Sequence, residues 1–181
     1  MPVPEGTTIR QARLEDIPTI LKFIQDLATY EKEPASTVEA TETSLENTIL
    51  FSDSPSTTTL SPTRPARALL LFTPSPSRQP AGLALYFYNY STWRARAGIY
   101  LEDLYVPEEF RGKGYGGALL AELAKEVVNI EGGRLEWSVL KWNEPSIRFY
   151  EGESVGAERM EGWVGMRVQG EALGRLAGRG I

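Results

Sequence analysis

The sequence predicts an α/β protein in which helices pack on a mixed sheet. Three observations support this class. Apolar residues alternate along some segments and recur with helical spacing along others. A glycine-rich turn joins a strand to a helix, and 41% of the residues are hydrophobic, enough for a real core. Residues 1–181 are expected to form a single domain, because one core typically takes about 100 to 200 residues. The expected element order is β-α-α-β-β-β-α-β-α-β.

The N-terminal part predicts a strand followed by an amphipathic helix. Residues 8–13 alternate, and apolar residues from Ile17 to Ala28 follow the i, i+3, i+4, i+7 spacing of one helix face. Asp16 is expected to be the N-cap of this helix. Pro18 falls in the first turn, where its missing N–H removes no intrahelical bond. A second, weaker helix is expected from Val38 to Phe51.

Two stretches rich in Ser, Thr and Pro, residues 52–65 and 73–80, predict loops. Apolar segments at residues 67–72 and 81–90 alternate with them and predict an antiparallel hairpin with a long tip. The rest of the chain predicts, in order, a strand at 98–106 stopped by Pro107, a helix that begins near Ala118 and ends at Gly132-Gly133, a strand at 134–140, a short helix at 145–150 and a last strand at 159–168.

The composition excludes several classes of active site. The chain has no cysteine and no histidine. Disulfides, thiolate nucleophiles, sulfur- or histidine-bound metals and the Ser-His-Asp triad are therefore excluded, and no metal site is expected. Any proton chemistry must use Glu, Asp, Lys, Tyr or water.

The net charge is −5 and the isoelectric point is near 5.0. This acidic balance disfavours a nucleic-acid partner and leaves room for a cationic one. The first ten residues, MPVPEGTTIR, do not have the pattern of a secretory signal. No apolar run approaches the ~20 residues that span a bilayer. We therefore expect a soluble cytoplasmic protein without a membrane partner, although these features do not separate cytosol from nucleus.

The turn at 111–117 reads RGKGYGG and lies between a predicted strand and a predicted helix. Its glycines let the backbone approach a ligand closely, and the helix adds its positive end, so the turn can bind an anion. If the turn binds no ligand, it would be only a flexible connector between the strand and the helix. Gly112-x-Gly114-x-x-Gly117 matches the dinucleotide fingerprint, whereas Arg111-x-x-Gly114-x-Gly116 matches the pyrophosphate loop of coenzyme A acyltransferases.

The surroundings of the turn separate these two possibilities. A dinucleotide motif places its first glycine directly after a strand, usually the first strand of a doubly wound sheet. Here residues 107–111 intervene, and the preceding strand is the fourth. No GxxxxGK[ST] motif is present, so the sequence does not support a P-loop nucleotide site.

Three motifs together resemble a known family. Residues 100–106 read YLEDLYV, residues 111–117 read RGKGYGG and residues 142–150 read WNEPSIRFY. In this order and spacing they resemble the GNAT superfamily of acetyl-CoA-dependent N-acetyltransferases, and more narrowly its spermidine/spermine group, which includes enzymes acting on thialysine and other small amines. The resemblance covers Ile9 to about Val168. It implies a GNAT-like fold, with a central, mostly antiparallel sheet, a splayed parallel pair and flanking helices.

The resemblance also implies the site. Tyr150 matches the general acid beside the thioester sulfur, and Glu102 matches the acidic residue that faces the amine. The residues implied to bind acetyl-CoA are Leu104, Tyr105, Val106, Arg111, Gly112, Lys113, Gly114, Tyr115, Gly116, Gly117, Asn143, Glu144, Pro145 and Ser146. Those implied to bind the amine are Tyr30, Glu31, Glu102, Glu161 and Trp163. Because members of this group pair through their C-terminal strands, a homodimer is also implied.

The residues themselves are consistent with direct acyl transfer to a small cationic amine. Such an amine has a pKa near 10.4 and is mostly protonated at neutral pH, so a carboxylate such as Glu102 could accept its proton. No covalent enzyme intermediate is needed, which suits a chain without Cys or His. Two other functions stay open at this point: an NAD(P)-binding oxidoreductase, and a catalytically inactive coenzyme A-binding interaction module.

Overall fold

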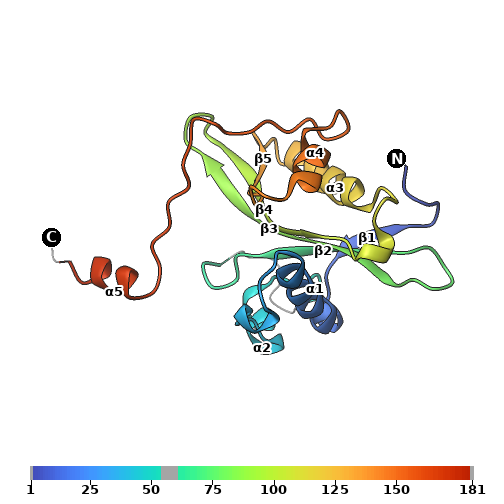
Figure 1. Ribbon diagram of the computed structural model, residues 1–181, viewed down its shortest axis with the longest axis horizontal. Coiled ribbons are helices and arrows are strands. Elements are labelled where there is room, and N and C mark those ends of the chain that lie inside the picture. Colours follow the sequence, from blue (N-terminus) through green and yellow to red (C-terminus); the bar gives the residue numbers. More distant parts are fainter. Residues whose placement is uncertain (1, 54–60, 180–181) are drawn as a thin grey trace.

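The computed structural model describes residues 2–53 and 61–179, and a five-stranded sheet lies at its centre (Figure 1). The strand order is β1-β2-β3-β4-β5. The first four strands pair antiparallel, and β4 pairs parallel with β5, which confirms the predicted mixed sheet. The strands are β1 Thr8–Gln11, β2 Arg67–Phe72, β3 Pro80–Ser91, β4 Arg96–Tyr105 and β5 Leu135–Trp137.

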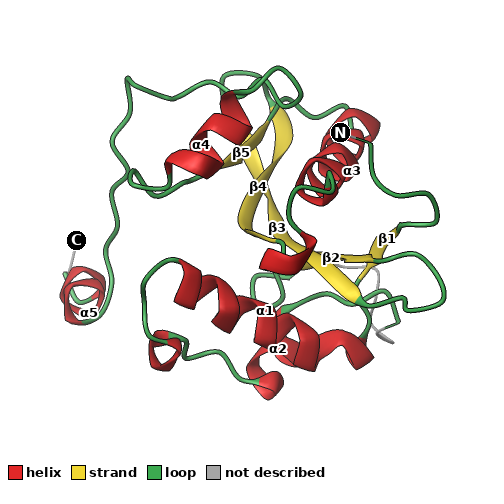
Figure 2. Cartoon of the chain, turned by 45° about the vertical axis from the view of Figure 1, so that its right-hand side comes forward, coloured by secondary structure: helices red, strands yellow, loops and turns green. Residues whose placement is uncertain are grey.

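Helices cover both faces of this sheet (Figure 2). One face carries α1 (Ile17–Tyr30) and α2 (Glu42–Thr48), and the other carries α3 (Tyr115–Asn129) and α4 (Glu144–Glu151). A fifth helix, α5 (Glu171–Ala177), lies apart from the sheet near the C-terminus (Figure 1). Short 3-10 turns occupy Leu14–Asp16, Ala35–Thr37 and Glu108–Phe110. None of the described helices is both long and apolar enough to cross a membrane.

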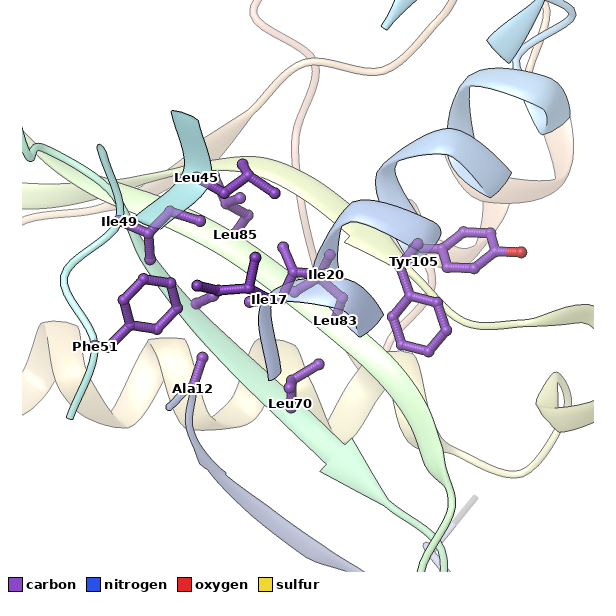
Figure 3. Close-up of a cluster of buried hydrophobic side chains, with 12 residues drawn as sticks. Ala12, Ile17, Ile20, Leu45, Ile49, Phe51, Leu70, Leu83, Leu85 and Tyr105 are labelled. Carbon is purple, nitrogen blue, oxygen red and sulfur yellow. The ribbon is translucent and has the colours of Figure 1, made fainter. Parts of the chain in front are cut away.

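Two hydrophobic cores result, one on each face. Ile17 and Ile20 of α1 pack with Leu70 and Leu83 of the sheet (Figure 3). On the other face, the alternate strand residues Leu69, Leu71 and Ala84 pack with α3. Because both faces of β2 are covered, its sequence RALLLF is almost continuously apolar.

Two irregularities of the sheet create space for a site. The register of β3 and β4 shifts between Leu85 and Tyr86, so Glu102 is an extra residue on β4 and Asp103 lies opposite Leu85. The β4–β5 ladder has only three pairs and ends at Leu101, whereas β4 continues to Tyr105. Beyond Leu101, the edge of β4 that faces β5 is therefore not paired with that strand.

The strand predicted at residues 159–168 is wrong. This segment forms no ladder, and it leads away from the sheet toward α5, which was not predicted (Figure 1). The alternation of Val164, Met166 and Val168 is that of a half-buried strand, but Val164 and Met166 are 84% and 89% exposed. Alternation alone cannot supply the neighbouring strand that a ladder requires.

Several predicted boundaries also change. The first strand ends at Gln11, the second helix is confined to α2, and the strand predicted at 134–140 shortens to β5. Asp16 is the N-cap residue of α1, as predicted, but its side chain makes no capping hydrogen bond to that helix. A 3-10 turn precedes α1, and the Asp16 carboxylate accepts from the backbone N–H of Arg13 and from the guanidinium of Arg10. The loop predicted at 52–65 lies partly outside the described residues.

Gly98 of β4 lets a side chain cross from β3 to β5. Asn89 Nδ2 donates to Glu136 Oε2 over a distance of 2.5 Å. A Cβ on Gly98 would lie 2.5 Å from Asn89 Oδ1 and 2.9 Å from the carbonyl oxygen of Arg134. We therefore expect Gly98→Ala to lower the free energy of unfolding by about 1–3 kcal/mol, the usual cost of overpacking. Urea denaturation measures this, and Gly162→Ala, which adds a methyl group in open space, should change little.

Candidate active site

A cavity of about 490 Å³ lies where β4 passes beyond its partner strand. The end of α1, the end of β4, the glycine-rich turn and α4 surround it. Its lining includes Tyr30, Tyr150 and most of the residues predicted to bind the coenzyme, namely Leu104, Tyr105, Val106, Arg111, Gly112, Gly114, Tyr115, Gly116, Gly117, Pro145 and Ser146. Residues from these four segments of the sequence thus meet around one cavity.

The glycine-rich turn adopts a conformation that suits glycine. Gly112 and Gly114 have φ angles of 72° and 78°, in the left-handed region. Gly114 is the N-cap of α3, so the first backbone N–H groups of this 15-residue helix, which have no intrahelical partner, lie at the cavity. A Cβ on Gly117 would meet nothing within 4 Å. The backbone is thus accessible beside the positive end of a helix, an arrangement that binds anions.

The opposite wall is the start of α4. Asn143 is buried and caps this helix, since its Oδ1 accepts from the backbone N–H of Ser146 at 3.4 Å. Pro145 occupies the first turn, as it often does in helices. The cap and the proline fix where α4 begins, so they also fix the path of Tyr150 near its end.

Tyr150 lines the cavity and carries a phenol there. Its ring packs against Trp137 and Phe149, with centroids 5.0 and 5.2 Å away. Burial, together with the neighbouring Tyr30 and Glu31, raises the pKa of Tyr150 to about 12. The hydroxyl is therefore protonated throughout the physiological range and can donate a hydrogen bond into the cavity.

Tyr30 links three parts of the site. Its hydroxyl donates to Asn143 Oδ1 at 3.0 Å, across 113 residues of sequence. The Arg111 guanidinium lies over its ring, 4.6 Å from the centroid. The adjacent Trp142 ring is 6.3 Å from the Tyr30 ring and carries Lys32 over its own face at 4.1 Å.

Three carboxylates lie in the same region, and they influence one another. Burial first, then the charges of Glu102 and Glu31, raises the pKa of Asp103 to about 6. Burial and Glu33 raise the pKa of Glu31. Glu102 itself is exposed. These negative charges beside a partly buried carboxyl group would attract a cation.

Asp103 was missed in the sequence analysis. The family resemblance pointed to Glu102 alone, and in a regular strand Glu102 and Asp103 would face opposite sides of the sheet. The register shift breaks this alternation and places Asp103 opposite Leu85, on the face covered by α1. The available signal was the pair of adjacent acidic residues within the otherwise apolar strand GIYLEDLYV.

Other predicted residues do not line the cavity. Lys113 points back along the turn, where its Nζ donates to the carbonyl oxygen of Glu109 at 3.0 Å. Glu144 is exposed in the first turn of α4. Glu161 and Trp163 lie in the exposed C-terminal segment, where the Trp163 ring is 6.4 Å from that of Trp93. Within the described residues, no group of three or more acidic side chains is arranged to hold a metal ion.

The chain is similar to known proteins over nearly its whole length. Residues 39–156 match the profile of the acetyltransferase (GNAT) family. The chain is 35% identical to the thialysine N-epsilon-acetyltransferase of Bos taurus, over 94% of this chain and 97% of that protein. It is 33% identical to the L-ornithine N5-acetyltransferase of Arabidopsis thaliana, over 91% and 85%. Among solved structures, an integron cassette protein of V. cholerae shares the fold with a TM-score of 0.73, at 22% identity and over 97% and 100% of the two chains.

Proposed function

The chain belongs to the acetyltransferase (GNAT) family, and from this we propose that it transfers the acetyl group of acetyl-CoA to a primary amine of a small cationic substrate. Thialysine, ornithine and polyamines represent this substrate class, and the first two are named substrates of its relatives. One observation carries the proposal. The anion-binding turn and the Tyr150 phenol line one cavity, and the carboxylates of Glu31, Glu102 and Asp103, which do not line it, lie next to the lining residues Tyr30 and Leu104 in the chain.

The residues around the cavity fit the coenzyme. Acetyl-CoA supplies an acyl group activated on a thioester sulfur. The N–H groups at the start of α3 would hold its pyrophosphate, and an added side chain at Gly117 would enter the space this group needs. The backbone of Leu104 to Val106, beyond the last pair of the β4–β5 ladder, would bond its extended amide chain.

The side chains would divide the chemistry between them. Asp103, Glu102 and Glu31 attract the cationic amine, and Asp103 or Glu102 accepts its proton, directly or through water. The amine nitrogen then bonds to the acetyl carbon while the carbon–sulfur bond breaks, and the nitrogen releases its second proton to solvent. Tyr150 donates a hydrogen bond to the departing thiolate. No step needs cysteine or histidine, and the sequence has neither.

The oxidoreductase alternative has no support in the described residues. Gly112 does not follow β4 directly, because the 3-10 turn Glu108–Phe110 lies between them. A dinucleotide turn would place its first glycine at the strand end. An inactive coenzyme-binding module would differ from the proposed enzyme in binding acetyl-CoA without acetylating any amine.

The test is a panel of amines with acetyl-CoA, in which release of the free thiol and acetylation of the amine are both measured. The panel contains thialysine, ornithine, lysine, spermidine, putrescine and a peptide N-terminus. We expect turnover on at least one small cationic amine and little on neutral amines. Coenzyme binding without turnover on any amine would support the inactive module instead. Tight NADH binding without coenzyme A binding would support the oxidoreductase.

Asp103→Asn is expected to make the protein more stable and the enzyme less active. A pKa raised from 3.8 to about 6 means that ionised Asp103 opposes folding at neutral pH, by at most about 3 kcal/mol. In the wild type, protonated Asp103 contributes to the stability of the folded protein. This contribution is fully present below pH 3.8 and is lost as the pH rises through about 6. The asparagine variant should therefore unfold at higher urea concentration at pH 7.

Activity should depend on the charge of Asp103 in the opposite sense to stability, because activity needs the ionised form. Because the ionised carboxylate binds the amine, wild-type kcat/KM should fall as the pH falls through about 6. In Asp103→Asn it should be about tenfold lower at pH 7.5, with that acidic limb removed. Glu5→Gln, which removes a charge from an exposed residue before β1, is the control. An unchanged profile in Asp103→Asn would assign the acidic limb to another group.

The exposed C-terminal segment supports a homodimer as part of this proposal. Val164, Met166 and Val168 present apolar side chains to solvent on alternate residues, and β5 is an edge strand. A second copy would pair with such a segment and bury its apolar side. Met166→Glu should then raise the dimer dissociation constant by at least about tenfold, because a charge would be buried in the interface. Sedimentation velocity at micromolar concentration measures this.

Arg167→Gln alters charge on the other side of the same segment and serves as the control for Met166→Glu. A wild-type chain that stays monomeric across the micromolar concentration range would contradict the dimer. The cytoplasmic location stays a prediction.

A further inference from the structure

Tyr30 contacts the two opposite walls of the cavity with different parts of its side chain. The ring lies under Arg111, which belongs to the glycine-rich turn. The hydroxyl donates to Asn143, which caps α4. Tyr30 is also the last residue of α1, so it joins the helix layer on one face of the sheet to elements on the other face.

The ring contact prepares Arg111 for an anion. A guanidinium that stacks on an aromatic ring uses its face, and its N–H donors, which point outward in the plane, remain available for oxygen ligands. The stem of Arg111 is also fixed, because its Nε donates to the carbonyl oxygen of Val106 at 2.9 Å. Arg111 lines the cavity beside Gly112 and Gly114, where the pyrophosphate is proposed to bind.

The hydroxyl contact determines how α4 begins. Asn143 is buried, and its Oδ1 accepts from both Tyr30 and the backbone N–H of Ser146. The Ser146 bond is long, at 3.4 Å, and the Tyr30 bond is shorter, at 3.0 Å. Since α4 has only eight residues, a change at its first turn is transmitted to Tyr150, seven residues after Asn143.

We propose that Tyr30 is a positioning residue with two separable parts, a ring that orients Arg111 for the coenzyme's diphosphate and a hydroxyl that orients α4, and with it Tyr150, toward the reacting sulfur. This inference rests on the proposed function. It differs from the role implied by the resemblance, in which Tyr30 lines the amine pocket. Its hydroxyl proton is donated to Asn143 and one face of its ring is covered by Arg111, so both parts of the side chain already contact the cavity walls.

Two substitutions separate the two parts. Tyr30→Phe keeps the ring and removes the hydroxyl, whereas Tyr30→Leu removes both. For Tyr30→Phe we expect coenzyme A affinity within about twofold of wild type and kcat reduced about three- to tenfold, the size of one lost hydrogen bond. For Tyr30→Leu we expect a further weakening of coenzyme A binding by about three- to tenfold, the size of a lost cation–π contact. The amine KM should change little in either variant.

The measurements are calorimetric titration with coenzyme A, kcat and KM at saturating cosubstrate, and the thermal midpoint. Tyr90→Phe, at an exposed tyrosine on β3, is the matched control for loss of a hydroxyl. A role confined to structure predicts lower thermal midpoints without the split between coenzyme affinity and kcat. A raised amine KM with normal kcat in Tyr30→Phe would return Tyr30 to the amine pocket and overturn the inference.

A second pair of variants tests the path through Asn143. Asn143→Asp keeps an acceptor for both partners and should therefore lower kcat less than Asn143→Ala, which removes the acceptor. In the Asn143→Ala background, Tyr30→Phe should have less than about a twofold further effect on kcat, because the shared bond is already lost. Independent, multiplying effects would contradict this path.

The outcome is distinguishable from failure of the proposed function. If the wild type binds coenzyme A but acetylates no amine, the transferase proposal fails, while the calorimetric comparison of Tyr30→Phe with Tyr30→Leu still tests the ring. If both variants bind coenzyme A as the wild type does, the part of the inference that concerns Arg111 fails whatever the activity.

Discussion

Replacing Gly117 by leucine is expected to weaken coenzyme A binding by at least about a hundredfold while leaving the fold intact. Gly117 lies in the first turn of α3 and lines the cavity. Its Cβ would meet nothing within 4 Å, so the leucine side chain would fill the space where the diphosphate is proposed to contact backbone N–H groups. Two lost charge-assisted hydrogen bonds at about 1.5–3 kcal/mol each correspond to a hundredfold or more.

Gly117 is a sharper test than its neighbours. Gly112 and Gly114 have positive φ, so any side chain there strains the turn and confuses folding with binding. Gly117 is helical, and leucine is a better helix former than glycine by about 0.8–1 kcal/mol. Stability to urea should therefore be equal or higher. Calorimetry measures affinity, and Gly174→Leu, in open space on α5, is the control. Unchanged affinity in Gly117→Leu would remove the turn from the binding site.

The part of the site that the sequence predicted well is local. The turn depends on glycines within seven consecutive residues, and Gly112 and Gly114 use glycine's access to positive φ. The helix after the turn was also predicted, although it begins at Tyr115 and not near Ala118. The cap at Asn143 and the proline two residues later likewise indicate where α4 begins. Such features are encoded in short windows, which can be interpreted without knowing the rest of the fold.

The parts that were missed depend on contacts distant in sequence. The bulge that places Asp103 opposite Leu85 depends on how β3 and β4 pair, and the sequence of one strand does not show this pairing. The bond from Tyr30 to Asn143 joins residues 113 positions apart. The segment at 159–168 shows the opposite failure, because its pattern is that of a strand but the described chain places no strand beside it. Pairing partners cannot be obtained from periodicity.

Tyr150→Phe is expected to lower kcat by about 10- to 100-fold while leaving coenzyme affinity and stability close to wild type. The ring remains packed against Trp137 and Phe149, and only the hydroxyl is lost. A hydrogen bond to a charged group typically contributes about 1.5–3 kcal/mol, which matches this range of rates. The measurement is kcat with both substrates saturating, together with the thermal midpoint.

The pKa of Tyr150 limits how large the effect can be. At about 12 it lies well above the value of about 8.5 for an ordinary thiol. Complete proton transfer from this phenol to the thiolate would therefore be uphill by about 5 kcal/mol. The hydroxyl instead stabilises the developing negative charge by donating a hydrogen bond, and the thiolate is protonated later by solvent. Catalysis by a well-matched general acid could reach ~10⁴, and we expect less than that here.

The high pKa of Tyr150 also determines how kcat should depend on pH. Because the phenol keeps its proton up to about pH 12, Tyr150 cannot be the group whose ionisation limits activity between pH 7 and 10. Any change of kcat with pH in that range should therefore have the same midpoint in Tyr150→Phe as in the wild type, on a lower plateau.

Tyr90→Phe, at an exposed tyrosine outside the cavity, should match the wild type in rate and in profile. Single-turnover rates ensure that chemistry, and not product release, is compared. A wild-type single-turnover rate in Tyr150→Phe would show that the hydroxyl does not act on the departing sulfur, and a midpoint that disappears with the hydroxyl would show that its pKa in the complex lies well below 12.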